Sequence, residues 1–203
     1  MKIFCIGRNY VNHAKELKNP VPKKPLVFSK FPTSLLKDNQ AFYYPDFSED
    51  IHHELELVLK VCKNGKKVQP QFAKDYYNEI ALGIDFTCRD IQSKLKEKGH
   101  SWEIAKAFDN SAPISEFIAL DSLADKNNIH FNLKKNGADV QIGYSKDMIF
   151  DFDYLICYIS QYFTLQKGDL IFTGTPEGVG PVAIGDKLEG FIEGKELLNF
   201  DIK

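Results

Sequence analysis

Two carboxylates lie one residue apart in a segment that is otherwise typical of a buried β-strand. Residues 53–59 read HELELVL, so the leucines at 55, 57 and 59 share one face while Glu54 and Glu56 share the other. This spacing places the two Glu Cα atoms roughly 6.5–7 Å apart, close enough for both side chains to bind one ion. Because Glu is depleted in strands and like charges repel, the pair indicates either a cation site or a solvated face of a sheet.

A third carboxylate follows another apolar run. Asp85 comes directly after residues 80–84 (IALGI), which are typical of a buried strand, and a helix is predicted to follow. A charge there is costly unless it is paired or binds a metal. Three carboxylates without paired His or Cys ligands favour Mg²⁺ or Mn²⁺ over Zn²⁺. The adjacent His52 and His53 point to opposite strand faces, so we expect one to pack and the other to support the site.

Cationic and basic side chains are spaced so that they could serve the same site. Arg89 and Gln92 are three residues apart and share the face of the predicted helix that looks back toward Asp85. Lys106 lies in a partly apolar stretch, where it either extends to solvent or stabilises an anion. In a predicted short helix over 12–17, His13 and Glu16 form either a base with its orienting carboxylate or an exposed polar face.

Short strands are predicted to dominate the elements that position these residues. Thr87 and Asp90 resemble a helix capping box, Asp153 is the expected N-cap of a late helix, and Asn64-Gly65 indicates a tight hairpin. This content favours an α+β single domain over a doubly wound sheet. We expect strands at 1–7, 26–28, 52–62 and 80–84, helices at 12–17, 72–79, 87–99 and 153–163, and a terminal hairpin over 187–202.

Composition argues against several classes of protein. The 203 residues are 43% hydrophobic and 27% charged with a formal net charge of −2, which is ordinary for a globular domain and offers no basic footprint for nucleic acid or an anionic membrane. No apolar run approaches the length of a membrane span, and residues 1–7 are too short for a signal peptide. Four scattered cysteines without a CxxC pair predict reduced thiols in a cytoplasmic protein.

Taken in order, the segments resemble the fumarylacetoacetate hydrolase family. Each motif alone is weak or moderate, but the ordered set is specific and covers nearly the whole chain. The most similar branch is the small single-domain acylpyruvase and oxaloacetate decarboxylase-like proteins. The matching stretches are 7–16 (GRNYVNHAKE), 25–30 (PLVFSK), 52–57 (HHELEL), 83–92 (GIDFTCRDIQ), 106–109 (KAFD) and 168–181 (GDLIFTGTPEGVGP).

The resemblance implies a metal enzyme with a mixed β-sandwich roll as its fold. It implies one catalytic domain over residues 1–203, usually a homodimer, with a mobile lid of helix and loop at about 10–25. It also implies one divalent metal per subunit, Mg²⁺ with Mn²⁺ or Ca²⁺ as substitutes, held by Glu54, Glu56 and Asp85.

The same resemblance assigns roles around the metal. His13 and Glu16 align with a dyad that activates water, and Lys106 with a catalytic contact to an enolate. The residues that align with substrate-binding positions are Arg89, Gln92, Lys30 and Thr175. In the glycine-rich stretch around Thr175, we weigh substrate binding equally against the need for a tight turn at Gly174 and Gly178.

A small 2-oxo acid is the implied substrate. The expected reaction is cleavage of the C3–C4 bond of an acylpyruvate or fumarylpyruvate through a pyruvate enolate. Decarboxylation of oxaloacetate, or isomerisation of 2-hydroxyhepta-2,4-diene-1,7-dioate, is the alternative on the same site. Three positions depart from the pattern of relatives: Phe31, Cys88 and Asp109-Asn110. We expect Phe31 and Trp102 to shape the pocket. We expect Phe42, Tyr43 and Tyr44 to lie in the core or an interface.

Two other classes of function were weighed. Closely spaced carboxylates also serve metal-dependent nucleases, but such sites often carry a Lys two residues after the second acid, and here that residue is Val58. The missing basic patch also counts against a nuclease. A non-catalytic metal-binding relative would be expected to lose part of the carboxylate triad or of the His13–Glu16 pair, and both are intact.

Overall fold

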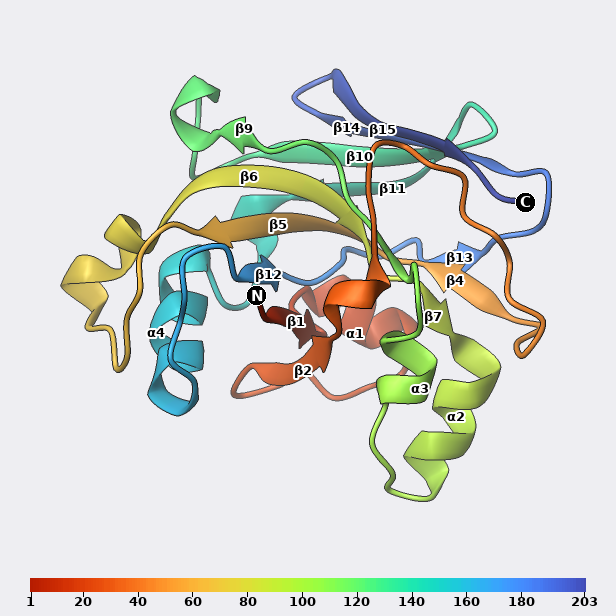
Figure 1. The fold of residues 1–203 in the computed structure, drawn as a ribbon, viewed down its shortest axis with the longest axis horizontal. Helices are drawn as coiled ribbons and strands as arrows, with labels where there is room; N and C mark the ends of the chain where they lie inside the picture. The colour runs from red at the N-terminus through yellow and green to blue at the C-terminus, as the bar shows by residue number, and fades with distance from the viewer.

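The computed structural model describes all 203 residues, and its largest sheet carries Glu56 in an inner strand, with Glu54 and Asp85 at the ends of inner strands. β1 and β12 run parallel, and every other pair of neighbours in this sheet is antiparallel. Figure 1 shows β5 and β6 as long curved strands through the middle of the molecule. The strand order is β2 (Leu26–Lys30), β1 (Ile3–Gly7), β12 (Leu170–Phe172), β5 (Leu55–Val61), β6 (Tyr77–Ile84) and β9 (Ile118–Ala119).

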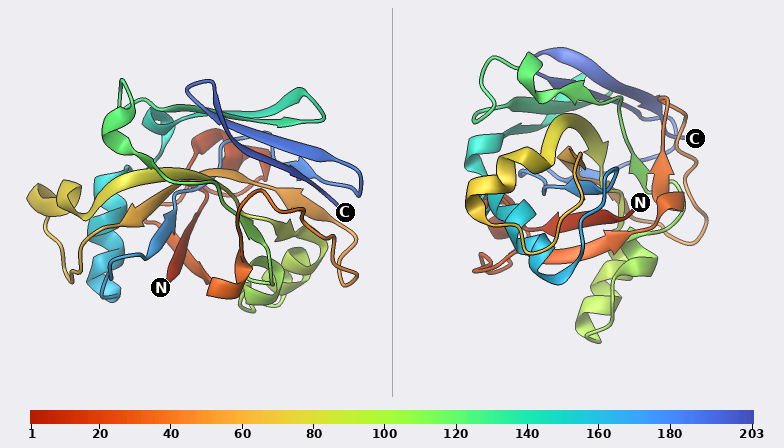
Figure 2. Two further views of the ribbon diagram at one scale, coloured as in Figure 1. Left: turned by 45° about the horizontal axis from the view of Figure 1, so that its top comes forward. Right: turned by 60° about the vertical axis from the view of Figure 1, so that its left-hand side comes forward.

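A second, antiparallel sheet lies over the first, and the two views of Figure 2 show the layers from other sides. The predicted terminal hairpin is confirmed, because residues 187–192 and 195–201 form two neighbouring strands of this second sheet. A core of 35 buried residues draws on the inward faces of both layers. The strand order is β11 (Ala138–Tyr144), β10 (His130–Lys135), β14 (Lys187–Ile192) and β15 (Lys195–Asp201).

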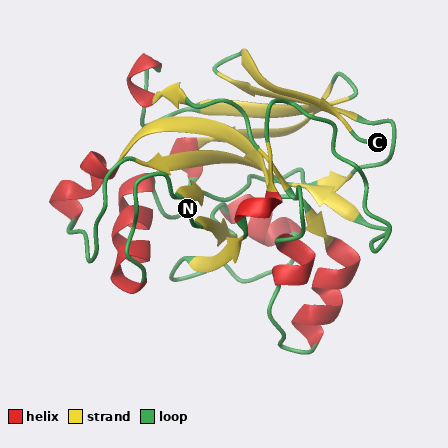
Figure 3. Ribbon diagram, in the orientation of Figure 1, coloured by secondary structure: helices red, strands yellow, loops and turns green.

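Short elements close the structure around these sheets. β4 (Ile51–His53) pairs with β13 (Gly180–Pro181) and β7 (Thr87–Cys88), and β3 (Leu35–Leu36) pairs with β8 (Ala112–Pro113). Figure 3 shows the helices around the margins of the strands. They are α1 (Val11–Glu16), α2 (Arg89–Glu97), α3 (Glu103–Lys106), α4 (Phe152–Tyr162) and the 3₁₀ helices η1 (Pro32–Ser34), η2 (Pro70–Tyr76), η3 (Leu120–Ser122) and η4 (Ser145–Asp147).

The predicted α+β class is confirmed, and β5 follows the alternation seen in the sequence. Leu55, Leu57 and Leu59 enter the main core, while Val58, on the opposite face, enters a smaller core between β5, β1 and β12. Glu56 is on this second face and is also buried, so neither face of the strand meets solvent. The alternative of a solvated sheet face is therefore wrong. No helix has the length and apolar character needed to cross a membrane.

Four local predictions are wrong, three of them because another part of the fold supplies the partner. The N-cap of α4 is Asp151, whose side chain accepts from the Tyr154 backbone N–H, while Asp153 accepts from the Tyr77 hydroxyl. α2 has no side-chain cap, because Asp90 accepts instead from Ser48. Residues 70–76 form a 3₁₀ helix and β6 begins at Tyr77, so no α-helix spans 72–79. The segment 64–65 forms no tight hairpin, since its glycine pairs with residue 165.

Candidate active site

Three buried carboxylates meet where β4, β5 and β6 come together. Glu54 lies between β4 and β5, Glu56 lies in β5, and Asp85 directly follows β6, the antiparallel neighbour of β5. The Asp85 backbone N–H donates to the Glu54 carbonyl at 2.8 Å, which fixes the two chain segments against each other. One oxygen atom from each carboxylate lies within 4.8 Å of the other two, and all three side chains are buried. The structure thus brings together the three predicted metal ligands.

Three cationic side chains, those of Lys106, Arg89 and Lys30, contact two of these carboxylates. Lys106 Nζ lies 2.8 Å from Glu54 Oε2 and 2.6 Å from Asp85 Oδ2. Arg89 Nη2 lies 2.6 Å from Glu54 Oε1, and Arg89 also donates to Gln92 Oε1 at 2.8 Å. Although burial opposes ionisation, Lys106 and Arg89 hold the pKa of Glu54 well below its ordinary value. Lys106 is itself buried, so the alternative that its side chain extends to solvent is wrong.

Glu56 is the carboxylate without a cationic contact. Its Oε2 accepts a hydrogen bond from the Gly174 backbone N–H at 2.7 Å. Burial and the nearby charge of Asp85 raise the pKa of Glu56 well above its ordinary value. A cluster of buried carboxylate oxygens in which one acid lacks a counter-charge fits a hard divalent cation, because Mg²⁺ and Mn²⁺ prefer oxygen ligands and would supply the missing positive charge.

Lys30 supports the site from behind. Its ammonium lies 2.9 Å from Asp85 Oδ1 and donates to Ser111 Oγ at 2.9 Å and to the carbonyls of Phe86 and Lys106. Lys30 does not line the cavity that contains the carboxylates. These contacts are those of a residue that positions Asp85 and the backbone at Lys106; a direct substrate contact for Lys30 stays a prediction.

One member of the predicted dyad, His13, lines the same cavity from α1, and Glu16 lies beside it. His13 Nδ1 lies 3.4 Å from Glu16 Oε2, and Glu16 Oε1 accepts from the Gly178 backbone N–H at 3.0 Å. Asn12 donates to Glu177 at 3.0 Å, so two contacts join α1 to the loop after β12. His13 is buried, and burial lowers its pKa more than Glu54 and Glu16 raise it. A neutral imidazole beside a carboxylate is suited to accept a proton.

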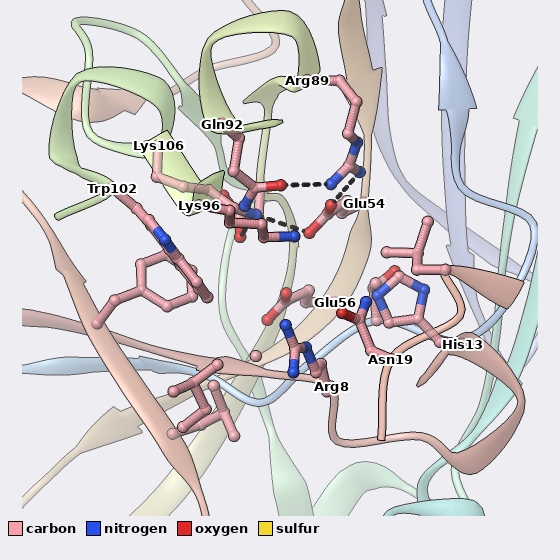
Figure 4. A pocket seen from close by; sticks show the side chains of 17 residues that line it. Arg8, His13, Asn19, Glu54, Glu56, Arg89, Gln92, Lys96, Trp102 and Lys106 are labelled. Carbon is pink, nitrogen blue, oxygen red and sulfur yellow. Dashed lines mark hydrogen bonds and ion pairs between the residues drawn. The ribbon is translucent and has the colours of Figure 1, made fainter. Parts of the chain in front are cut away.

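Figure 4 shows the arrangement, with Glu54 and Glu56 near the centre, Arg89 and Lys106 above them and His13 to the right. The residues brought together around the cavity include eight of the predicted site residues, which lie on six different segments. They are joined by cavity-lining residues to which the sequence analysis gave no site role, notably Arg8, Lys96 and Asn19. Trp102 lines the cavity as predicted, whereas Phe31 is exposed and does not. The predicted site residues that line it are His13, Glu54, Glu56, Asp85, Arg89, Gln92, Lys106 and Thr175.

Gln141 is a buried supporting residue that the sequence analysis missed. Its Oε1 accepts from the Leu55 backbone N–H at 2.9 Å and lies 3.0 Å from His53 Nδ1, and its Nε2 donates to Thr175 Oγ1 at 2.8 Å. Burial lowers the pKa of His53 to about 4, so its neutral ring can donate to Gln141. Because Val140 and Ile142 flank Gln141 in β11, alternation alone would turn the glutamine outward; here Ile142 is exposed and the glutamine points inward.

The glycines of the loop after β12 are required by its geometry. Gly174 has φ +102°, and a Cβ there would lie 2.5 Å from Asn9 Cβ. Gly178 has φ +92°, and a Cβ there would lie 2.2 Å from the Val140 carbonyl oxygen. Asn9 is fully buried and joins this loop to the segment before α4, because it donates to the carbonyls of Thr173 and Phe150 and accepts from the Phe150 N–H. The need for a tight turn therefore explains both glycines.

Phe42, Tyr44 and the cysteines have the packing roles predicted for them, whereas Tyr43 does not lie in the core. Phe42 is buried in the main core and packs 4.2 Å from Phe86 between ring centroids, while Tyr43 is exposed. Tyr44 packs partly buried against the same core. The cysteines at 5 and 88 are buried and those at 62 and 157 are half-buried, and all four are free thiols.

The chain belongs to the fumarylacetoacetate hydrolase family. The family model for the fumarylacetoacetate (FAA) hydrolase C-terminal region matches residues 2–202. This agrees with the resemblance found in the sequence motifs.

The individual relatives include tautomerases, decarboxylases and hydrolases. The chain is 43% identical over 202 residues to the mitochondrial oxaloacetate tautomerase FAHD1 of Arabidopsis thaliana, covering 100% of this chain and 91% of the relative. It is 44% identical over 204 residues to the mitochondrial oxaloacetate decarboxylase of Dictyostelium discoideum, covering 99% and 93%. The structure of fumarylpyruvate hydrolase from Pseudomonas aeruginosa in complex with Mn²⁺ and pyruvate matches with a TM-score of 0.94 at 33% identity, covering 100% of this chain and 89% of that one.

Proposed function

We propose that this protein is a Mg²⁺-dependent enzyme that cleaves the C3–C4 bond of a 2-oxo acid of the acylpyruvate type. The observation that carries the proposal is that the carboxylate triad and His13, which has Glu16 beside it, line one cavity. Glu54, Glu56 and Asp85 would hold the metal, with Mn²⁺ or Ca²⁺ as substitutes. When bound, the metal would act as a Lewis acid toward the 2-oxo acid.

The protein's own residues account for the remaining chemistry. His13, neutral at pH 7, would take a proton from a water molecule that attacks the C4 carbonyl, and Glu16 would hold the imidazole in place and stabilise its protonated form. Cleavage leaves a pyruvate enolate, whose negative charge the Lys106 ammonium is placed to stabilise. Arg89 and Gln92, which are hydrogen-bonded to each other on the cavity wall, would orient the substrate carboxylate, and Thr175, which also lines the cavity, would contact the substrate.

Oxaloacetate is the second candidate substrate, and the names of the Arabidopsis and Dictyostelium relatives favour it. Loss of CO₂ from oxaloacetate, or interconversion of its keto and enol forms, passes through the same type of enolate but needs no attacking water. The two reactions therefore depend differently on His13.

A pair of variants distinguishes the role of the metal site from the role of the base. His13→Ala should lower hydrolysis of acetylpyruvate or fumarylpyruvate by roughly 10²–10⁴-fold, which is typical of removing a general base. The same variant should lose much less oxaloacetate decarboxylation. Glu56→Gln should abolish Mg²⁺-dependent turnover of every substrate, and Glu97→Gln on the exposed surface of α2 is the matched control. Hydrolysis undiminished in the His13 variant would contradict the assigned base, and full activity of the Glu56 variant would contradict the metal site.

Assembly and location complete the proposal. We propose a homodimer, which sedimentation of the purified protein would test. A cytoplasmic location also stays a prediction, and the names of the Arabidopsis and Dictyostelium relatives place those proteins in mitochondria.

A further inference from the structure

Two cationic side chains face the cavity without an acidic partner of their own. Arg8 follows β1 and enters from the lower side in Figure 4, and Lys96 projects from α2 on the opposite side. Neither forms an ion pair or a hydrogen bond through its side chain within the protein. By contrast, the cations that contact the triad all form ion pairs, because Lys30, Lys106 and Arg89 each pair with Glu54 or Asp85.

The backbone holds Arg8 in an unusual conformation. Its φ is +60°, in the left-handed region that residues other than glycine, asparagine and aspartate rarely adopt. The residue is half-buried, and burial lowers the pKa of its guanidinium. A strained backbone that aims a partly desolvated cation into a cavity is typical of a ligand-binding position.

Lys96 approaches the same space. Its ammonium lies 5.5 Å from the centroid of the Trp102 ring, which forms part of the cavity wall. Lys96 as a whole is exposed, but desolvation of its ammonium beside the cavity, together with the nearby charges of Arg8 and Arg89, lowers its pKa to about 8. Arg8 and Lys96 are therefore close enough to influence each other, and both are mainly cationic at pH 7.

The positive charges around the cavity outnumber the negative ones. Three cations, Lys30, Arg89 and Lys106, contact Glu54 and Asp85, so the contacting cations equal the triad's carboxylates in number although none of them contacts Glu56. Arg8 and Lys96 remain as positive charge that the protein does not neutralise, and a divalent metal would add to it. A ligand with one carboxylate would leave most of this charge uncompensated, whereas a dicarboxylate has a second anionic group to offer.

We propose that Arg8 and Lys96 form a subsite for the distal carboxylate of the substrate, so that the enzyme selects dicarboxylic over monocarboxylic 2-oxo acids. The inference rests on the proposed function, because it assumes that the 2-oxo acid end of the substrate lies at the triad. Oxaloacetate and fumarylpyruvate carry such a second carboxylate, and acetylpyruvate does not. Trp102 would lie beside the carbon chain that joins the two acidic ends.

Binding of unreactive ligands tests the proposal apart from catalysis. Titration calorimetry with Mg²⁺ present would compare 2-oxoglutarate with 2-oxopentanoate, and 2-oxoadipate with 2-oxohexanoate, so that each pair differs in its terminal carboxylate at two chain lengths. The wild-type protein should bind at least one dicarboxylate roughly tenfold to a hundredfold more tightly than its monocarboxylate, as charged hydrogen bonds imply.

Variants assign that preference to the two residues. Lys96→Gln and Arg8→Asn should each reduce it about tenfold while leaving monocarboxylate affinity nearly unchanged; asparagine tolerates the left-handed backbone at position 8. Lys94→Gln, which removes a charge from the exposed side of the same helix, should leave the preference intact. Arg8→Lys should keep part of it.

The outcomes distinguish the two proposals. Equal binding of both acids by the wild-type protein, or equal loss of both in the variants, would overturn the distal subsite even if acetylpyruvate is hydrolysed. Failure of every 2-oxo acid to bind, together with no turnover of acetylpyruvate, would overturn the proposed function and the subsite with it.

Discussion

Replacing Glu56 with glutamine should stabilise the metal-free protein while it destroys metal binding. Glu56 is buried beside Asp85 and has only the Gly174 N–H as a hydrogen-bond partner. A glutamine carbonyl can still accept that bond. The substitution removes a buried carboxylate that lies beside Asp85 and that no cation contacts, so the variant should be more stable in a chelator and lose the advantage when Mg²⁺ is added.

The expected size of the effect follows from the geometry of the triad. Two unit charges 4.8 Å apart, the limiting separation of the ligand oxygens, repel by about 3.5 kcal/mol at an effective dielectric constant of 20. Lys30 and Lys106 contact Asp85 and screen part of this repulsion. A net stabilisation of about 1–3 kcal/mol therefore remains, which corresponds to an increase in Tm of about 2–4 °C per kcal/mol for a chain of this size.

The effect should also depend on pH in a defined direction. The pKa of Glu56 in the folded protein lies above its ordinary value of 4.5. Above pH 4.5 the unfolded chain therefore releases a proton that the folded, metal-free protein retains, and stability falls as pH rises toward the folded pKa. Glu56→Gln lacks this loss, so its advantage should be small at pH 4.5 and grow at higher pH.

Urea unfolding in a chelator at several pH values between 5 and 8, repeated with excess Mg²⁺, measures both effects. Mg²⁺ should raise the midpoint of the wild-type protein and leave that of the variant unchanged, because only a protein that binds the ion is stabilised by it. Glu97→Gln, an exposed charge removal on α2, should shift neither midpoint. A variant that is less stable than wild type in the chelator would refute the argument, since it would mean that the Glu56 carboxylate is held by net attraction.

Three further predictions concern the loop after β12, its anchor and the base. Gly174→Ala should destabilise the protein by about 2–4 kcal/mol in urea unfolding. Gly137→Ala is the control and should cost about 1–2 kcal/mol, because φ is also positive there but a Cβ meets no atom within 4 Å. Equal losses in the two variants would exclude the clash with Asn9. Asn9→Ala removes three buried hydrogen bonds and should cost about 3 kcal/mol, visible as a lower urea midpoint; a change below about 1 kcal/mol would contradict the role of its side chain. His13 must be neutral to act as a base, so hydrolysis should fall as pH drops through a pKa below 6.5; a pH–rate profile with a limb above 6.5 would argue against it.

The parts of the fold that could be predicted from the sequence are those set by local periodicity. Alternation in residues 53–59 predicted strand β5 and the shared face of Glu54 and Glu56, and the apolar run before Asp85 predicted strand β6. The three-residue spacing of Arg89 and Gln92 predicted that they share one helix face, and they are hydrogen-bonded in the structure. Such predictions succeed because strand and helix periods are properties of the backbone itself.

Local rules failed where a distant residue competes for the same group. Asp90 sits where a capping box would place it, yet its carboxylate accepts from Ser48, 42 residues earlier in the chain. Aspartate is a preferred N-cap residue, but the Asp153 carboxylate accepts a hydrogen bond from the Tyr77 hydroxyl instead. In both cases the side chain had a local partner available and the fold supplied another, which no window of sequence contains.

By itself the sequence determined which chemistry was available: three carboxylates in strand contexts, a His–Glu pair at helical spacing, and motifs specific enough to indicate the family. Only the tertiary structure decided what these groups contact. Lys106 could extend to solvent or bind an anion, and its approach to Glu54, 52 residues away, decides between the two. Gln141, Arg8 and Lys96 enter the site for the same reason. Their positions depend on how strands and helices far apart in the chain pack together, because burial and ion pairing arise between elements and not within them.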